Sequence, residues 1–168
     1  MLVVSLLLLL VLTILAVAAS QTTRLQERMA WNMRDVDLAF QGAEAGLRAA
    51  EKFLATPPSL TALNPCSNPA DENCFVLEQG YFTDIDLTRE NSSWWTSNAR
   101  PYGDASAQEI SDVTEEPRFV IEELETIPFS LKVGHGPPPG KTYYKSTARS
   151  PGGTNTSVAV VESVFARE

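Results

Sequence analysis

The first segment of the chain is apolar without interruption. Residues 1–19 carry polar side chains only at Ser5 and Thr13, and the first charged residue is Arg24. About 20 apolar residues, each adding ~1.5 Å of helix, cross the ~30 Å hydrocarbon core of a membrane. A cleavable signal is the alternative, because small residues near the end of the run fit a cleavage site. Such signals, however, begin with basic residues and have a shorter apolar stretch. The pattern therefore predicts a transmembrane helix over residues 1–23.

After this run the apolar positions become one-sided. They recur every three or four residues, at Leu25, Met29, Met33, Val36, Phe40, Ala43, Leu47, Ala50 and Leu54. This spacing is close to the helical period and forms one stripe, which we expect to pack on a sheet or on a partner. Because the first proline is Pro57, nothing stops the helix earlier. We predict one helix of roughly 53 residues, amphipathic over 24–55. At the polar stretch 20–23 we expect a bend or local unwinding.

Strand patterns follow in the last third of the chain. They cover three segments: Arg118–Leu124, Thr142–Arg149 and Ser157–Phe165. Glycine- and proline-rich stretches at 134–140 and 151–153 separate them, which favours an antiparallel meander over residues 118–168. One face of such a sheet needs a cover, and the one-sided helix is available. The predicted fold class is α+β, with a long helix laid across a small antiparallel sheet.

The middle of the chain, residues 56–117, is predicted to be rich in loops. A short strand is expected within Phe75–Thr83, and residues 84–117 are polar and irregular. Within this region Trp94 and Trp95 are interpreted as anchors that pin the loop to the core; an exposed partner-binding patch is the alternative. Earlier in the chain, Gly42 and Gly46 form a GxxxG pattern. It is interpreted as a slim helix face approached closely by a sheet or loop, or by another helix.

The charge is distributed unevenly along the chain. The 13 basic and 21 acidic residues give a net charge of −8, and residues 24–55 hold five of each sign, so the whole excess lies in residues 56–168. An acidic surface repels nucleic acid and anionic lipid headgroups. Nucleic acid is therefore excluded as a partner.

Two cysteines, Cys66 and Cys74, lie in a loop rich in proline and asparagine. An even number of cysteines beside a membrane anchor indicates an oxidising compartment and predicts a Cys66–Cys74 disulfide, with free thiols as the alternative. Zinc sites need four ligands, and the only histidine is His135. No zinc site is predicted.

Catalytic motifs are missing from the sequence. It contains no GxSxG, no phosphate-binding glycine loop and no HExxH pattern, so we predict a protein that is not an enzyme. Asp84, Asp86 and Glu90 are weak candidates for a calcium loop. Arg89 stands where an EF-hand needs glycine, which favours a solvated acidic loop. No cofactor is predicted, with calcium as the alternative.

Several segments resemble one family. The opening Met-Leu-Val-Val-Ser and the leucine run resemble type IV pilins and pseudopilins. The segments Leu25–Arg34, Ala39–Arg48 and Tyr143–Arg149 are similar to PilX-type minor pilins, over residues 1–54 and 140–168. The resemblance implies a type IV pilin-like fold, with a globular extracytoplasmic domain over residues 24–168. It also implies that a prepilin leader is removed and that Met1 is the methylated N-terminus.

The resemblance also implies a role. Such a minor pilin helps to prime or assemble a type IV pilus, the organelle of twitching motility and cell adhesion, together with other minor pilins, the major pilin and a tip adhesin. It waits in the inner membrane with its C-terminal domain in the periplasm, and is then extracellular in the pilus.

One departure from the family pattern concerns position 5. Most pilins have glutamate there, whereas this chain has Ser5. An unpaired carboxylate in a membrane costs roughly 2.5 kcal/mol or more, so a subunit without a neighbour on that side gains by lacking it. We therefore expect a place at or near the filament tip. The alternatives are a tip pseudopilin of a type II secretion system and a membrane-tethered ligand-binding or sensor domain.

Overall fold

The computed structural model describes residues 2–71, 73–105, 110–129 and 140–167. The contacts between residues within the chain divide it into two units, Met1–Asp35 and Val36–Glu168. Met1 and His135 lie outside the described residues, and so does the predicted loop 134–140 except for Gly140, which begins a strand.

The long N-terminal helix α1 covers Leu2–Ala55, which confirms the predicted length. No unwinding occurs at the polar stretch 20–23, so that part of the prediction is wrong. The hydroxyls of Thr22 and Thr23 each donate a 3.1 Å hydrogen bond to the carbonyl four residues earlier. These bonds satisfy the hydroxyls within the helix, which accommodates the polar side chains without unwinding.

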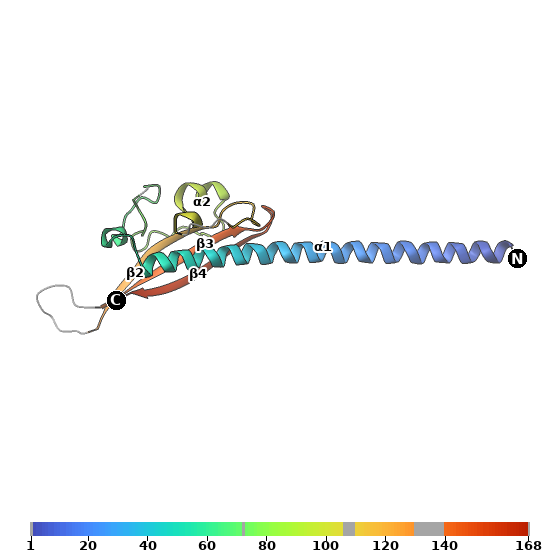
Figure 1. The fold of residues 1–168 in the computed structure, drawn as a ribbon, viewed down its shortest axis with the longest axis horizontal. Helices are drawn as coiled ribbons and strands as arrows, with labels where there is room; N and C mark the ends of the chain where they lie inside the picture. The colour runs from blue at the N-terminus through green and yellow to red at the C-terminus, as the bar shows by residue number, and fades with distance from the viewer. Residues whose placement is uncertain (1, 72, 106–109, 130–139, 168) are drawn as a thin grey trace, which may run out of the picture. The chain divides into compact units, whose positions relative to one another are not determined.

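Four antiparallel strands form one sheet in the order β1-β2-β3-β4. Figure 1 shows β2, β3 and β4 beside the C-terminal part of α1. Their bounds are Arg100–Pro101 for β1, Arg118–Pro128 for β2, Gly140–Pro151 for β3 and Val158–Arg167 for β4. The three predicted strands are confirmed. Strands β2 and β4 extend beyond the prediction at their C-terminal ends and β3 at both ends, whereas β4 begins one residue later than predicted. Strands β2 and β3 pair with a bulge at Glu123/Glu125, whereas β3 and β4 pair without a shift.

The middle region contains short elements that the sequence pattern did not reveal. They are the 3-10 helix η1 at Leu60–Leu63, α2 at Ser92–Asn98 and α3 at Tyr102–Ala105. The strand expected within Phe75–Thr83 is absent from this described segment. Leu77 alone forms isolated bridges to Cys66 and Glu122, and Gly80, at φ 83°, then turns the chain. A residue with positive φ ends regular strand geometry, so the segment does not continue as a strand.

Side chains from both faces of the sheet are buried, because neighbouring residues of a strand point to opposite sides. Phe119 and Ile121 of β2 join one apolar cluster with the C-terminal part of α1 (Ala49, Ala50 and Leu54) and with Tyr144 and Ala148 of β3. Val120, between them, joins a second cluster with Trp95, Leu77, Phe82 and Leu87. The helix therefore covers one face of the sheet, and the middle region covers part of the other.

Candidate functional site

The N-terminal part of α1 exposes apolar side chains around its whole circumference. Each large apolar residue from Leu2 to Val17 is between 52% and 79% exposed. By its length and composition the helix is long and apolar enough to cross a membrane. An exposed apolar surface of this extent needs a cover other than water.

Ser5 lies on this apolar segment. Its Oγ donates a 2.8 Å hydrogen bond to the carbonyl of Leu2. The side chain at position 5 is therefore neutral and its donor is satisfied by its own helix. The predicted methylation site, Met1, lies outside the described residues.

The predicted stripe divides into an exposed part and a buried part. Leu25, Met29, Met33, Val36 and Phe40 are exposed, from 48% for Phe40 to 78% for Met33. Leu47 is partly buried and packs on the helix–sheet cluster. Val36 and Phe40 thus do not pack on the sheet, and the other role given to the stripe, contact with a partner, stays a prediction.

The contact with the sheet is made by Ala43, Ala50 and Leu54 of the predicted stripe, together with small residues beside them. The buried residues of the helix are mostly small: Ala39, Gly42, Ala43, Gly46, Ala49, Ala50 and Leu54. A β-carbon added at Gly42 would lie 2.3 Å from Ser150 Oγ, and one at Gly46 would lie 3.3 Å from Ala148 Cβ. The interpretation of Gly42 and Gly46 as a site of close approach by the sheet is confirmed, and the sheet residues concerned belong to β3.

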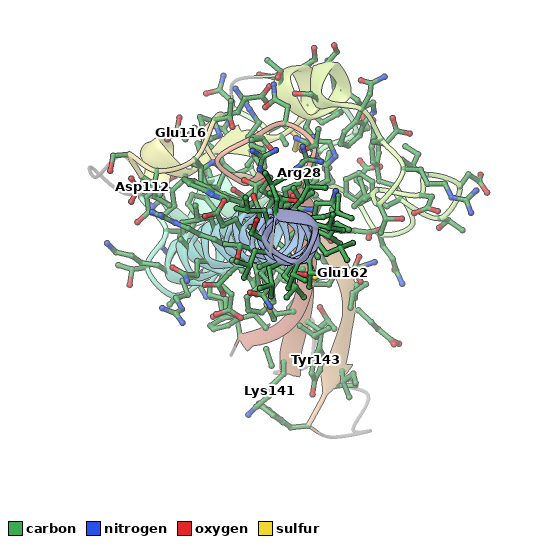
Figure 2. The ribbon with its side chains drawn as sticks, turned by 90° about the vertical axis from the view of Figure 1, so that its right-hand side faces the viewer. Arg28, Asp112, Glu116, Lys141, Tyr143 and Glu162 are labelled. Carbon is green, nitrogen blue, oxygen red and sulfur yellow. A yellow bond between two sulfur atoms is a disulfide. The ribbon has the colours of Figure 1, made fainter. Side chains whose placement is uncertain are left out.

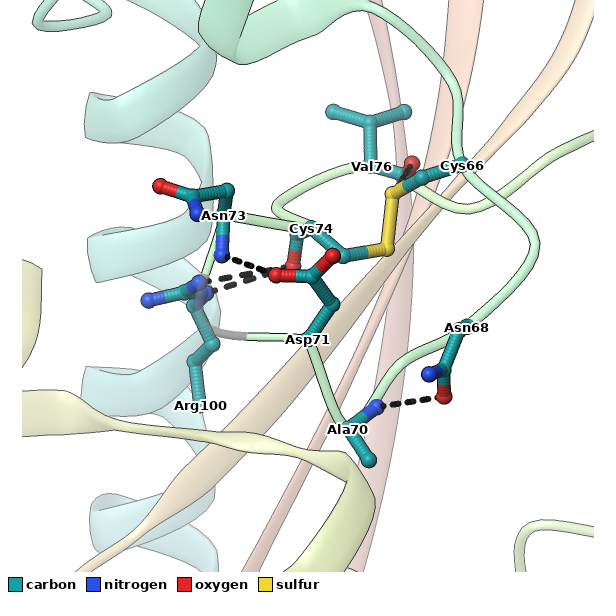
Figure 3. The surroundings of a disulfide bond; sticks show 8 residues. All are labelled: Cys66, Asn68, Ala70, Asp71, Asn73, Cys74, Val76 and Arg100. Atoms are coloured by element: carbon teal, nitrogen blue, oxygen red, sulfur yellow. Dashed lines mark hydrogen bonds between the residues drawn. A yellow bond between two sulfur atoms is a disulfide. The ribbon is translucent and has the colours of Figure 1, made fainter.

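The Cys66–Cys74 disulfide is present, as predicted (Figure 3). The backbone of Cys66 is bonded on both sides, to the carbonyl of Val76 at 3.0 Å and to the amide of Glu78 at 3.1 Å. The guanidinium of Arg100 donates to the carbonyl of Cys74 and lies 3.7 Å from the centroid of the Phe75 ring. That ring stacks on Phe53 of α1, with centroids 4.9 Å apart. The disulfide loop is thereby attached to the helix–sheet core.

The tryptophan pair lies in α2. Asn91 caps this helix, and its side chain accepts a 2.9 Å hydrogen bond from the amide of Trp94. Trp95 is fully buried, and its Nε1 has no hydrogen-bond partner. Trp94 is half-buried and meets Trp95 and Phe82 edge-on. Trp95 anchors the middle region on the sheet, whereas Trp94 still presents part of its surface to solvent.

The acidic loop is closed by its own side chains. Asp86 Oδ1 accepts hydrogen bonds from the Oγ1 (2.6 Å) and the amide (3.1 Å) of Thr88, and Oδ2 lies 3.1 Å from Arg89 Nε. The hydrogen bond from the Thr88 side chain is the main cause that lowers the pKa of Asp86. Asp84 and Glu90 do not join it in a metal-binding cluster among the residues the structure describes.

Glu122 is a buried carboxylate that the strand pattern did not single out. It is 6% exposed, and its Oε1 accepts hydrogen bonds from the amides of Gly80 (2.9 Å) and Phe82 (3.4 Å). Buried carboxylates are retained where donors satisfy them. Glu122 therefore ties the turn at Gly80 to β2. The available signal was its place between Val120 and Leu124, two apolar residues on the same face of the strand.

Comparison with known families decides the identity of the chain. Residues 1–48 match the family model described as PilX N-terminal, and residues 63–167 match the one described as type IV pilus assembly protein PilX C-term. The chain belongs to the PilX family. Neither a curated protein nor a solved structure matches it.

Membership of the PilX family confirms the predicted resemblance and agrees with the pilin-like α+β fold. The C-terminal match also includes residues 63–117, for which the sequence segments suggested no relative. The chain is thus a type IV pilus assembly protein whose partners are pilus components, and its apolar helix is consistent with a membrane anchor.

Removing the disulfide from this PilX-family chain is expected to destabilise the disulfide loop. In the chain-entropy model, loss of a bond that closes so short a loop lowers the free energy of unfolding by about 2.5 kcal/mol. A Cys66→Ser/Cys74→Ser variant should therefore unfold at lower denaturant concentration than the oxidised protein. Reducing the wild type should give the same midpoint, and a reduced wild type as stable as the oxidised form would contradict the expectation.

Proposed function

We propose that the chain is a non-enzymatic minor pilin that helps to prime or assemble the pilus at or near the filament tip, together with other minor pilins and a tip adhesin. The observation that carries the proposal is the helix that is apolar around its full circumference from Leu2 to Val17. The family membership supplies the context of the type IV pilus. This context favours a pilus over a secretion system.

The proposed route begins in the inner membrane, with residues 24–168 in the periplasm. A helix that is apolar on every side exchanges lipid for neighbouring helices at little cost, because both surroundings are apolar. The exposed stripe Leu25–Phe40 would then meet helices of other subunits as the chain enters the filament. Contacts of this head-to-tail kind propagate along a helical assembly and leave one subunit without a neighbour at the end.

The proposed tip position rests on Ser5. A carboxylate at this depth needs a cation to offset roughly 2.5 kcal/mol or more. Ser5 carries no charge, and its hydroxyl is bonded to the Leu2 carbonyl of the same helix. A subunit at the tip has no neighbouring subunit beyond it to supply a cation, and the uncharged side chain of Ser5 does not need one.

The tip position can be checked by imaging. A labelled wild-type chain is expected at one end of each pilus, and Ser5→Glu is expected to insert into the membrane normally yet reduce the fraction of labelled tips. Ser5→Ala is the matched control, since it removes the hydroxyl without adding charge, and it should behave as the wild type does. Wild-type label spread evenly along the shaft, or normal piliation with Ser5→Glu, would refute the tip assignment.

A further inference from the structure

The last strand, β4, forms one edge of the described sheet. All ten residues of Val158–Arg167 pair one to one with β3, and no other described strand pairs with β4. Natural edge strands are blunted by short length, proline, bulges, lysines or a covering element. Strand β4 is ten residues long, where five or six are usual, and it contains no proline, no lysine and no bulge. Among the described residues, the edge therefore has only the charges of Glu162 and of the terminal Arg167 as devices against pairing.

The two faces of β4 differ in burial, and the buried face holds the strand in place. On the helix side, Val161 and Phe165 pack on the helix–sheet cluster, and Ser163 Oγ donates a 2.8 Å hydrogen bond to Glu51 of α1. On the outer side, Val158 is 44% exposed and Val164 is 61% exposed. The helix thus fixes the strand, while the outer face stays accessible. A fixed strand is a preformed template, which lowers the entropy lost when another segment pairs with it.

Glu162 is the charged residue in the centre of this edge strand. Its carboxylate lies 3.2 Å from Lys145 Nζ and accepts a 3.3 Å hydrogen bond from Thr147 Oγ1, both on β3. The Glu162 side chain is nevertheless 48% exposed. Figure 2 shows it on the sheet, together with Tyr143 and Lys141 of β3. It can therefore accept a further cation from a strand placed on its free side.

We propose that the free edge of β4 binds an extended segment of a different pilus subunit by strand addition, which rests on the proposed role in pilus assembly. Main-chain hydrogen bonds supply the affinity, and alternate side chains supply the specificity. The segment carries aliphatic or β-branched side chains beside Val160 and Val164, and a lysine or arginine opposite Glu162.

A second copy of the chain fits this edge poorly. Antiparallel pairing of two β4 strands over all ten residues places Glu162 opposite Ser163, and the registers on either side place it opposite Glu162 or Val164. None of these registers brings a lysine or arginine opposite Glu162, and like charge destabilises the Glu162–Glu162 register. The charge at the centre of the strand therefore favours a partner that is different in sequence and basic at that position.

A pair of proline variants tests the proposal in the full-length chain. Successive N–H groups of an antiparallel strand point alternately to its two sides, and proline has no N–H. The two variants are Ala159→Pro and Val160→Pro. One of them removes a backbone hydrogen bond to β3, and the other removes only an N–H donor on the free edge. We expect one variant to unfold at lower temperature. The other should keep the wild-type Tm yet be recovered with purified pili about fivefold to tenfold less, as the loss of one hydrogen bond implies.

Hydrogen exchange supplies the second measurement. In assembled pili, alternate amides of β4 should become protected relative to the purified full-length chain in detergent, while the amides bonded to β3 stay protected in both. If the chain is present in pili but the edge amides still exchange freely, strand addition is refuted and the assembly role stands. A cross-link that joins β4 to β4 of another copy overturns the choice of partner. Absence of the chain from pili refutes the proposed function itself.

Discussion

Replacing Trp95 with alanine is expected to lower the free energy of unfolding by about 3–5 kcal/mol, the usual cost of emptying a large buried aromatic site. Trp95 is fully buried and is the largest fully buried side chain among the described residues. It connects α2 to Val120 of β2 and to the loop residues Leu77, Phe82 and Leu87. Without it, the middle region loses its main apolar contact with the sheet.

Two further variants separate packing from hydrogen bonding at this site. Because Trp95 Nε1 has no partner, Trp95→Phe removes volume but no hydrogen bond, and it should cost clearly less than Trp95→Ala. Trp94→Ala is the matched control, since Trp94 is the adjacent tryptophan but is only half-buried. Chemical denaturation of the three variants gives the comparison. Equal losses for Trp94→Ala and Trp95→Ala would contradict the assignment of Trp95 as the anchor.

Elements whose apolar residues recur with a regular helical or strand period were predictable from the sequence. Elements that form only through tertiary contacts were not. The helix Leu2–Ala55 and the strands β2, β3 and β4 follow from apolar spacing and from proline and glycine positions. Strand β1 has only two residues and owes its assignment to pairing with Phe119 and Arg118 of β2. The segment around Leu77 likewise depends on a bridge to Glu122, far along the chain. No local pattern carries such information.

The face of the helix that packs on the sheet could be predicted only in part. Sequence reasoning chose one stripe from the helical spacing of its apolar residues, which includes Val36 and Phe40 as well as Ala43, Ala50 and Leu54. The fold buries the alanines of this stripe and the glycines beside them against the sheet, since small residues let a helix and a sheet approach closely. Val36 and Phe40 remain exposed. In a subunit of an assembly, that surface is available to other chains.

The second large effect is expected where the helix and the sheet are closest. Gly42→Val should lower the free energy of unfolding by about 1–3 kcal/mol or more, the cost of overfilling a packed site. A β-carbon at position 42 would lie 2.3 Å from Ser150 Oγ and 2.9 Å from Ser150 Cβ. Rotating the serine hydroxyl away relieves the first contact but not the second. The helix must therefore move away from β3, which loosens the neighbouring apolar cluster.

Gly46 provides the matched control, one helical turn away on the same face. A β-carbon there would lie 3.3 Å from Ala148 Cβ, a tight contact that needs a shift of only tenths of an ångström. Gly-to-Ala replacement inside a helix also gains about 1 kcal/mol of helix propensity. Gly46→Ala should therefore be close to neutral, whereas Gly42→Ala should be destabilising. Thermal unfolding of both decides between a steric cause and a general intolerance of this helix to β-carbons.

A compensating change identifies the clashing partner. Ser150→Gly removes both atoms that a β-carbon at position 42 would meet most closely, so it should recover much of the stability lost in Gly42→Ala. The sum of the two single effects should then exceed the loss in the double variant, because residues in contact do not act additively. Additive losses would mean that Ser150 is not what limits the approach of α1 to β3. The small residues at 42 and 46 would then need a different explanation, such as a contact with another helix.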